Sequence, residues 1–221
     1  GDISLAGTSA TFTGAVDADG KISQTAGTAT FKETVDVAGN IELSNANTET
    51  TFEKAITNVT DLTISGKNAS FDAVNATGAI TQSAGSSTFA GTVNAAKINL
   101  NGTNAEFTNT VSALDISQTA GNATFTGDVS ATDITLSGDS ASFNNVTSTG
   151  LISQTAGTST FAGAVDAGNI NLGGTSAEFT NTVSASDITQ TAGTASFQAV
   201  NATGDISLAG TSATFTGAVD A

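Results

Sequence analysis

The amino-acid sequence predicts an all-β fold, a single-stranded parallel β-helix (β-solenoid) of about 12 coils of about 18 residues each. Three observations predict it. Phe recurs at a nearly constant interval, an aliphatic residue lies nine residues before most of these Phe residues, and the composition is narrow, with no Cys, His, Met, Trp, Tyr, Pro or Arg. Such a composition is typical of one short pattern copied many times along a chain.

The Phe ladder sets the period of the repeat. From Leu62 onward the aliphatic ladder has a period of 18 residues, while its first three intervals are 19, 19 and 21 residues. The longest interval contains residues 45–51, for which we expect a small bulged loop. We number the coils 1 to 12 by their Phe residues, which are predicted to form the structural core: Phe12, Phe31, Phe52, Phe71, Phe89, Phe107, Phe125, Phe143, Phe161, Phe179, Phe197 and Phe215.

Three short strands are predicted in each coil. In residues 168–185 the apolar side chains alternate with polar ones, as in Ile170 and Leu172, then Ala177 and Phe179, then Val183 and Ala185. This period of two is typical of β-strands. Two helices within 18 residues would be too short to be stable, so a helical repeat is excluded.

Glycine marks the corners between the strands. Two residues after Phe, several coils have Gly, as at Gly14 and Gly163, whereas others have Asn109 or Asn181. Because Gly and Asn both tolerate positive φ, this exchange predicts a left-handed backbone position there.

Stacking of the coils is expected to place each Phe ring about 4.8 Å from the Phe ring of the next coil. Burial of one Phe, one Ile and one Val would then stabilise each coil by roughly 5–7 kcal/mol before conformational entropy is subtracted. Each coil would depend mainly on its neighbours, which is typical of solenoid repeats.

Two types of coil are distinguished by the residue two positions after the Ile. Glutamine coils have Gln there, and aliphatic coils have Leu or Ile. The five Gln residues are predicted to face inward, where each amide would satisfy backbone groups at a corner; a ligand-binding row of Gln is the alternative. The Gln residues are Gln24, Gln82, Gln118, Gln154 and Gln190, and the aliphatic residues are Leu5, Leu43, Ile64, Leu100, Leu136, Leu172 and Leu208.

Residues 1–221 are interpreted as one continuous solenoid. Residues 204–221 repeat residues 1–18 letter for letter, which suggests a higher-order repeat of 203 residues. We expect the sequence to be a slice of a longer repeat array. The alternative is that separate molecules stack end to end, since a bare last coil exposes the edge of a sheet.

Composition and charge argue against several classes of function. With 20 acidic residues against 5 basic ones, the net charge is −15, which disfavours nucleic acid and anionic membranes as partners. No apolar stretch is long enough to span a bilayer, so no membrane insertion is expected. Without His or Cys the usual catalytic triads and most zinc sites are absent. A pectate-lyase type of enzyme would need basic residues in a groove. We therefore expect neither enzymatic activity nor a cofactor.

Stacked carboxylates are the only candidate metal ligands. Asp115 lies one period from Asp133, and Asp187 lies one period from Asp205. Because hard cations take carboxylate oxygens, these pairs are weak candidates for a surface cation such as Ca²⁺, although a solvated surface is the simpler interpretation. Thr-x-Thr rows flank some Phe residues, but charged residues interrupt them too often for an ice-binding face.

The repeats resemble those of large bacterial surface proteins, namely autotransporter passengers and filamentous-haemagglutinin-like adhesins. The similarity is carried by Gly-Asn-Ile-Asn-Leu at 168–172, Ala-Thr-Phe-Thr-Gly at 10–14 and Phe-Ala-Gly-Ala-Val-Asp-Ala at 161–167. This resemblance implies a right-handed β-helix that is exported to the cell surface or the extracellular space. The regularity of the repeats favours a stalk or filament. Its partner would be another copy of the same chain, bound by end-to-end stacking or lateral assembly. The alternative is an adhesin passenger that binds surface carbohydrate or a host.

Overall fold

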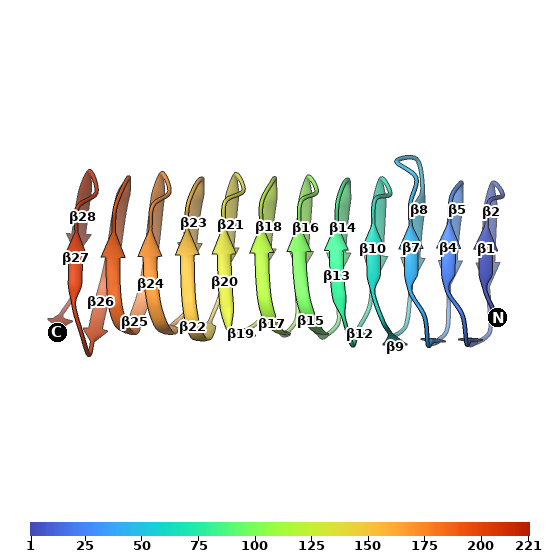
Figure 1. Cartoon of the computed structure of the whole chain (residues 1–221), viewed down its shortest axis with the longest axis horizontal. Coiled ribbons are helices and arrows are strands. Elements are labelled where there is room, and N and C mark those ends of the chain that lie inside the picture. The colour runs from blue at the N-terminus through green and yellow to red at the C-terminus, as the bar shows by residue number, and fades with distance from the viewer. The chain divides into compact units, whose positions relative to one another are not determined.

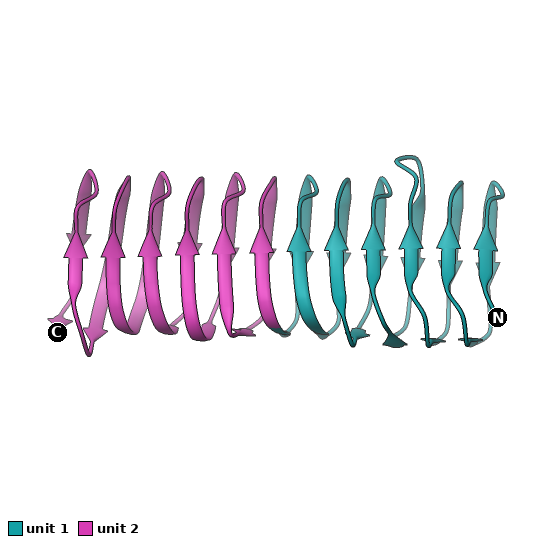
Figure 2. Ribbon diagram, viewed as in Figure 1, with its two compact units in different colours: residues 1–113 teal, residues 114–221 magenta.

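The computed structural model describes residues 1–221 and confirms an all-β solenoid. It contains 29 strands and no helix, and the strands of successive coils pair in parallel. Two compact units divide the chain, Gly1–Ala113 and Leu114–Ala221 (Figure 2). Each unit is a stack of six coils, and β17 (Val111–Gln118) contains the boundary between the units.

Each coil of unit 1 has three sides. The first side begins at the Ile or Leu of the aliphatic ladder, the second ends at Phe, and the third begins at Val or Ile. The first-side strands are β1 (Ile3–Leu5), β4 (Ile22–Gln24), β7 (Ile41–Leu43), β10 (Leu62–Ile64) and β13 (Ala79–Gln82). The second-side strands are β2 (Ser9–Phe12), β5 (Thr28–Phe31), β8 (Glu49–Phe52), β11 (Asn68–Phe71), β14 (Ser86–Phe89) and β16 (Asn104–Phe107). The third-side strands are β3 (Val16–Ala18), β6 (Val35–Val37), β9 (Ile56–Val59) and β12 (Val74–Ala76), while β15 (Val93–Leu100) covers the third side and then the first side of the next coil.

Unit 2 has the same three sides, but more of its corners are bridged by continuous strands. Its single-side strands are β18 (Asn122–Phe125), β19 (Val129–Ala131), β20 (Asp133–Leu136), β21 (Ser140–Phe143), β23 (Thr158–Phe161), β27 (Ile206–Leu208), β28 (Ser212–Phe215) and β29 (Val219–Asp220). Its longer strands are β22 (Val146–Gln154), β24 (Val165–Leu172), β25 (Ser176–Gln190) and β26 (Thr194–Ala202).

The ladder between coils explains these long strands. Between β24 and β25 the pairing runs from Val165 with Val183 to Leu172 with Gln190, and within it only Gly168 and the opposite Ser186 are not paired. Neighbouring coils of equal length therefore keep their hydrogen bonds around the corner. Three sides per coil are confirmed, but the corner from the third side to the first is not always a break.

The coils of each unit wind with a right-handed sense. In Figure 1 the first-side strands rise nearest the viewer and the second-side strands descend behind them, while the chain advances from right to left. This agrees with the handedness that connections between parallel strands adopt almost without exception.

The Phe residues form a buried ladder in each unit, as predicted. In unit 1 consecutive ring centroids lie 4.6 Å apart for Phe12 and Phe31, and 5.4 Å apart for Phe52 and Phe71. In unit 2 the spacing is 4.6 Å for Phe161 and Phe179, with the ring planes 3° from parallel. Ten of the rings are fully buried, whereas Phe12 and Phe215 in the end coils are half-buried because one face of each lacks a neighbour.

Two expectations about the corners were wrong. The loop expected at residues 45–51 is shorter, because Glu49 and the two residues after it belong to β8, so the loop spans residues 44–48. The left-handed positions are not the glycines after Phe. Positive φ is found at one Asn, Asn58, and at the Gly three residues after each buried Gln: Gly27, Gly85, Gly121, Gly157 and Gly193.

Small size, and not positive φ, explains some of the glycines that follow Phe. A Cβ atom at Gly163 would lie 2.2 Å from Asn145 Oδ1, and one at Gly91 would lie 2.6 Å from the Ala73 amide nitrogen. At the same position Asn109 and Asn181 use their side-chain oxygens to accept the amide of the following residue. The exchange of Gly and Asn therefore reflects crowding between coils and a local turn.

Candidate functional site

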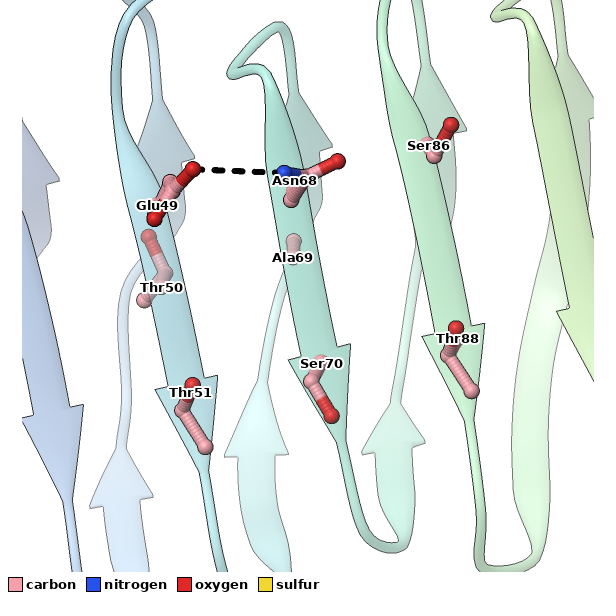
Figure 3. A pocket seen from close by; sticks show the side chains of 8 residues that line it. All are labelled: Glu49, Thr50, Thr51, Asn68, Ala69, Ser70, Ser86 and Thr88. Atoms are coloured by element: carbon pink, nitrogen blue, oxygen red, sulfur yellow. Dashed lines mark hydrogen bonds between the residues drawn. The ribbon is translucent and has the colours of Figure 1, made fainter.

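A shallow groove lies on the second side of unit 1 (Figure 3). It has a volume of about 270 Å³ and crosses β8, β11 and β14. Ser70 pairs in register with Thr51 on one side and Thr88 on the other, so three hydroxyl side chains line up across the groove. The full lining is Glu49, Thr50, Thr51, Asn68, Ala69, Ser70, Ser86 and Thr88.

Glu49 is the only ionisable side chain in this groove, and it is already engaged. Its Oε1 accepts a hydrogen bond from Asn68 Nδ2 at 3.3 Å and lies 3.2 Å from Lys67 Nζ, which is largely exposed. A groove of this kind offers hydroxyl and amide groups to a polar ligand such as a carbohydrate, but it holds no pair of acid and base side chains.

Unit 2 has a depression in the corresponding place on its second side. It has a volume of about 310 Å³ and one acidic side chain, Glu178. Most of its polar groups come from three successive coils, namely Ser176 from the first, Thr194 from the second, and Ser212 and Thr214 from the last. Polar depressions therefore recur on the second side of both units, and comparable ones lie on the third side of unit 2, where Ser184 and Asn201 contribute to them.

The structure places the predicted aspartate pairs side by side. Asp115 pairs in register with Asp133, and the amide of Asp205 donates to Asp187 Oδ1 at 2.8 Å. The amide of Leu151 likewise donates to Asp133 Oδ1 at 2.7 Å. One oxygen of each of these two carboxylates thus binds the backbone of the next coil, which is a structural use of the side chain.

No group of three or more Asp and Glu side chains is arranged to hold a metal ion. The two aspartate pairs lie in different coils, at 115–133 and at 187–205, so each could supply only its remaining oxygens to a surface cation. The cation site stays a prediction.

The buried Gln residues bind the backbone, in agreement with the first interpretation of the Gln row. Gln118 is 1% exposed, and its Nε2 donates to the carbonyl of Gly121 at 2.8 Å and to that of Ser140 in the next coil at 2.7 Å. Gln82, Gln154 and Gln190 make the same two bonds in their own coils. Their amides are enclosed within the stack and are not presented to a ligand.

Four of the five glutamine coils, all except that of Gln24, fit the aliphatic coil that follows them through a Gly. A Cβ atom at Gly102 would lie 2.5 Å from Gln82 Nε2, and one at Gly210 would lie 2.3 Å from Gln190 Nε2. Gly therefore recurs 20 residues after these Gln residues because only a residue without a side chain leaves room for the amide. This constant spacing is visible in the sequence, but the contact between the two residues depends on how closely the corners of successive coils stack.

Each glutamine coil also fits the aliphatic coil that precedes it. Gly27 has a φ of 67°, and a Cβ atom there would lie 2.3 Å from the carbonyl oxygens of Gly7 and Thr8. A Cβ atom at Gly193 would lie 2.1 Å from the carbonyl oxygen of Gly174. The left-handed Gly thus rests directly on the corner backbone of the aliphatic coil below it. The two coil types have complementary axial faces.

Comparison of the chain with known protein families, with curated proteins and with solved structures found no match. The structure contains no helix with the length and hydropathy needed to cross a bilayer. The similarity to autotransporter passengers and haemagglutinin-like adhesins therefore rests on the repeat pattern alone, and what it implies is taken up as a proposal below.

Proposed function

We propose that this protein is a structural repeat protein whose coils build an extended stalk or filament outside the cell. The observation that carries the proposal is the unbroken set of residue columns in each unit. In unit 2, Phe, Ile and Val each lie on the same residue type of the next coil, as in the pairing of Ile170 with Ile188 and of Val165 with Val183. A stack built in this way gains length with each coil and needs no separate core.

The outer surface is consistent with this role. Acidic side chains are distributed over the exposed positions, and the net charge of −15 opposes lateral association of neighbouring molecules. The outer surface is also regular from coil to coil, because only the loop at residues 44–48 departs from the corner pattern. The absence of Cys is compatible with export of an unfolded chain, because no premature crosslink can form.

Insertion of one extra pair of coils tests the proposal. A second copy of residues 150–185, a glutamine coil followed by an aliphatic coil, placed after residue 185 keeps the coil types in order. We expect the maximum dimension from small-angle X-ray scattering to increase by about 10 Å, which is twice the spacing between strands. An unchanged maximum dimension with retained β circular dichroism would contradict a role that depends on length.

The hydroxyl-lined grooves favour a second candidate function, an adhesin that binds surface carbohydrate. The corresponding grooves on the second sides of both units are the specific observation for it. A glycan array probed with the intact protein tests this function. Binding that is weakened by Ser70→Val and unaffected by Ser112→Val, on the third side, would support it, and the absence of any bound glycan would argue against it.

A further inference from the structure

A Gly follows the first side in every aliphatic coil except coil 3. The residue pairs at this corner are Ala6-Gly7, Ser65-Gly66, Asn101-Gly102, Ser137-Gly138, Gly173-Gly174 and Ala209-Gly210. In coil 3 the corner is two residues longer, and its Thr48, which is 0% exposed, fills the space against Gly66 of coil 4. Coil 6 alone places Asn before the corner Gly, and no other Asn in the chain is followed by Gly.

The corner of coil 6 leaves one amide without a hydrogen bond. The amide of Asn101 donates to the Gln82 carbonyl at 2.8 Å, and that of Thr103 donates to the Gly85 carbonyl at 2.7 Å. The amide of Gly102, between them, donates to no acceptor. Asn101 is exposed and makes a polar contact of its own, with which any reaction of its side chain has to compete. An exposed side-chain amide thus lies next to a backbone nitrogen that is available as a nucleophile.

We propose that Asn101 is a site of spontaneous deamidation, at which its side-chain amide is converted to a carboxylate by way of a succinimide. The Gly102 nitrogen forms a bond to Cγ of Asn101 and gives up its proton, while the bond from Cγ to Nδ2 breaks and ammonia leaves. Gly favours this step because it has no Cβ atom to crowd the attacking nitrogen. Water then opens the ring at either of its carbonyls, which leaves aspartate or isoaspartate at residue 101.

Isoaspartate at residue 101 would disturb the fit between coils 5 and 6. Its main chain is longer by one CH2 group, and this group enters the corner in which a Cβ atom at Gly102 would already lie 2.5 Å from Gln82 Nε2. The same Nε2 donates to the carbonyl of Asn104, just beyond the corner, at 2.7 Å. The modification also adds a negative charge, so ageing of the chain would be recorded at one corner and would loosen that corner.

A matched pair of Asn-Gly sites tests the role of the corner. Ala90→Asn creates a second Asn-Gly pair, in coil 5, at an exposed position where coil 8 has Asn144. The amide of Gly91 differs from that of Gly102, because it donates to the Asp72 carbonyl at 3.1 Å.

The Ala90→Asn protein is incubated at neutral pH, and loss of the amide at both sites is followed by peptide mass mapping. In the folded protein we expect Asn101 to react several-fold faster than the introduced Asn, because only the latter must first lose a backbone hydrogen bond. In urea the two rates should converge. A reaction at Asn101 that is no faster than that of the introduced Asn in the folded protein would overturn the proposal.

The equivalent corner of unit 2 provides the converse test. Ser137 and Asp139 donate their amides to the preceding coil at 2.8 Å, as their counterparts do in coil 6, and the amide of Gly138 donates to no acceptor. Ser137→Asn should therefore create a new reactive site, whereas Asn101→Ser, which gives coil 6 the residue of this corner, should abolish the fast reaction. An unreactive Ser137→Asn protein, or fast ammonia release that persists in Asn101→Ser, would also overturn the proposal.

A stability measurement separates the longer main chain from the added charge. Asn101→Asp adds the charge alone, whereas aged protein contains isoaspartate, which enzymatic methylation of isoaspartyl residues detects. The aged protein should unfold at a lower urea concentration than Asn101→Asp, and equal midpoints would contradict the expected loosening of the corner. The inference goes beyond the proposed structural role and does not depend on it, because the scattering experiment on the lengthened chain has a separate readout.

Discussion

The fit between Gln82 and Gly102 makes a quantitative prediction for a double-mutant cycle. In Gly102→Ala the new methyl group would lie 2.5 Å from Gln82 Nε2 and 2.6 Å from its Cδ, which is closer than any relaxed contact. Overpacking of this kind costs about 1–3 kcal/mol. The lower entropy of the unfolded chain with Ala offsets about 0.4–1 kcal/mol of this loss. We therefore expect Gly102→Ala to lower the free energy of unfolding by roughly 1–2 kcal/mol.

The partner substitution removes hydrogen bonds. Gln82→Ala deletes the bonds from Nε2 to the carbonyls of Gly85 and Asn104, at 2.9 and 2.7 Å. Loss of a donor to buried carbonyls costs about 1–3 kcal/mol. In the double variant the methyl group introduced by Gly102→Ala enters space that the amide has left, so the combined loss should fall short of the sum by about 1 kcal/mol or more.

Urea unfolding followed by far-ultraviolet circular dichroism measures the cycle, since the chain has no Trp or Tyr for fluorescence. Gly173→Ala is the matched interior control, because its nearest contacts would be Thr191 Oγ1 at 3.2 Å and the Gln154 carbonyl at 3.4 Å, and the equivalent residue in coil 6 is Asn101. It should change stability by less than about 0.5 kcal/mol. If the two substitutions add within about 0.3 kcal/mol, or if the control is as costly as Gly102→Ala, the reasoning about axial fit is refuted.

Three further predictions follow from the ladders and the surface pairs. Phe161→Ala, which removes a ring stacked on both faces, should cost about 3–5 kcal/mol in urea unfolding, and Phe215→Ala, with one stacked face, distinctly less; equal losses would argue against the ladder. Asp187→Ala should cost about 1 kcal/mol because the amide of the next coil loses its acceptor, whereas Asp187→Asn should restore most of it; equal effects of Ala and Asn would show that the oxygen is dispensable. The hydrogen bond from Lys21 to Glu42, with their charge attraction second, raises the pKa of Lys21 above its usual 10.5. The small stabilisation from this exposed pair should be present below pH 10.5 and vanish as the pH rises through the raised pKa. Thermal melts should therefore show a lower melting temperature for Glu42→Gln than for the unchanged protein only below the raised pKa. A difference that persists above it would contradict the prediction.

Much of the fold could be predicted because the repeat makes each apolar column visible many times. The alternation of Ile170 with Leu172, and of Ala177 with Phe179, identifies inward positions without knowledge of the corners. The inward direction of Gln118 followed from the same period, because it occupies the position that Leu has in neighbouring coils. Register between coils then required only equal coil lengths.

The corners could not be predicted as well, because a Gly can be required for different reasons. Gly163 and Gly210 avoid contacts with a neighbouring coil, whereas Gly157 adopts positive φ, and the sequence alone does not separate these roles. The polar grooves were missed for a related reason. The sequence predicts Thr-x-Thr rows beside some Phe residues, but it does not show that Thr51, Ser70 and Thr88 line one depression.

The longer corner at residues 44–48 has a consequence for the parity of the array. A block of eleven coils with strict alternation would begin and end on an aliphatic coil, so two short-cornered aliphatic coils would meet wherever one block followed another. The extra aliphatic coil accommodated by Thr48 shifts the alternation by one step, so coil 11 is a glutamine coil and fits coil 12, which repeats the sequence of coil 1. A single two-residue lengthening thus lets the sequence of coil 1 recur after eleven coils without bringing two short-cornered aliphatic coils together.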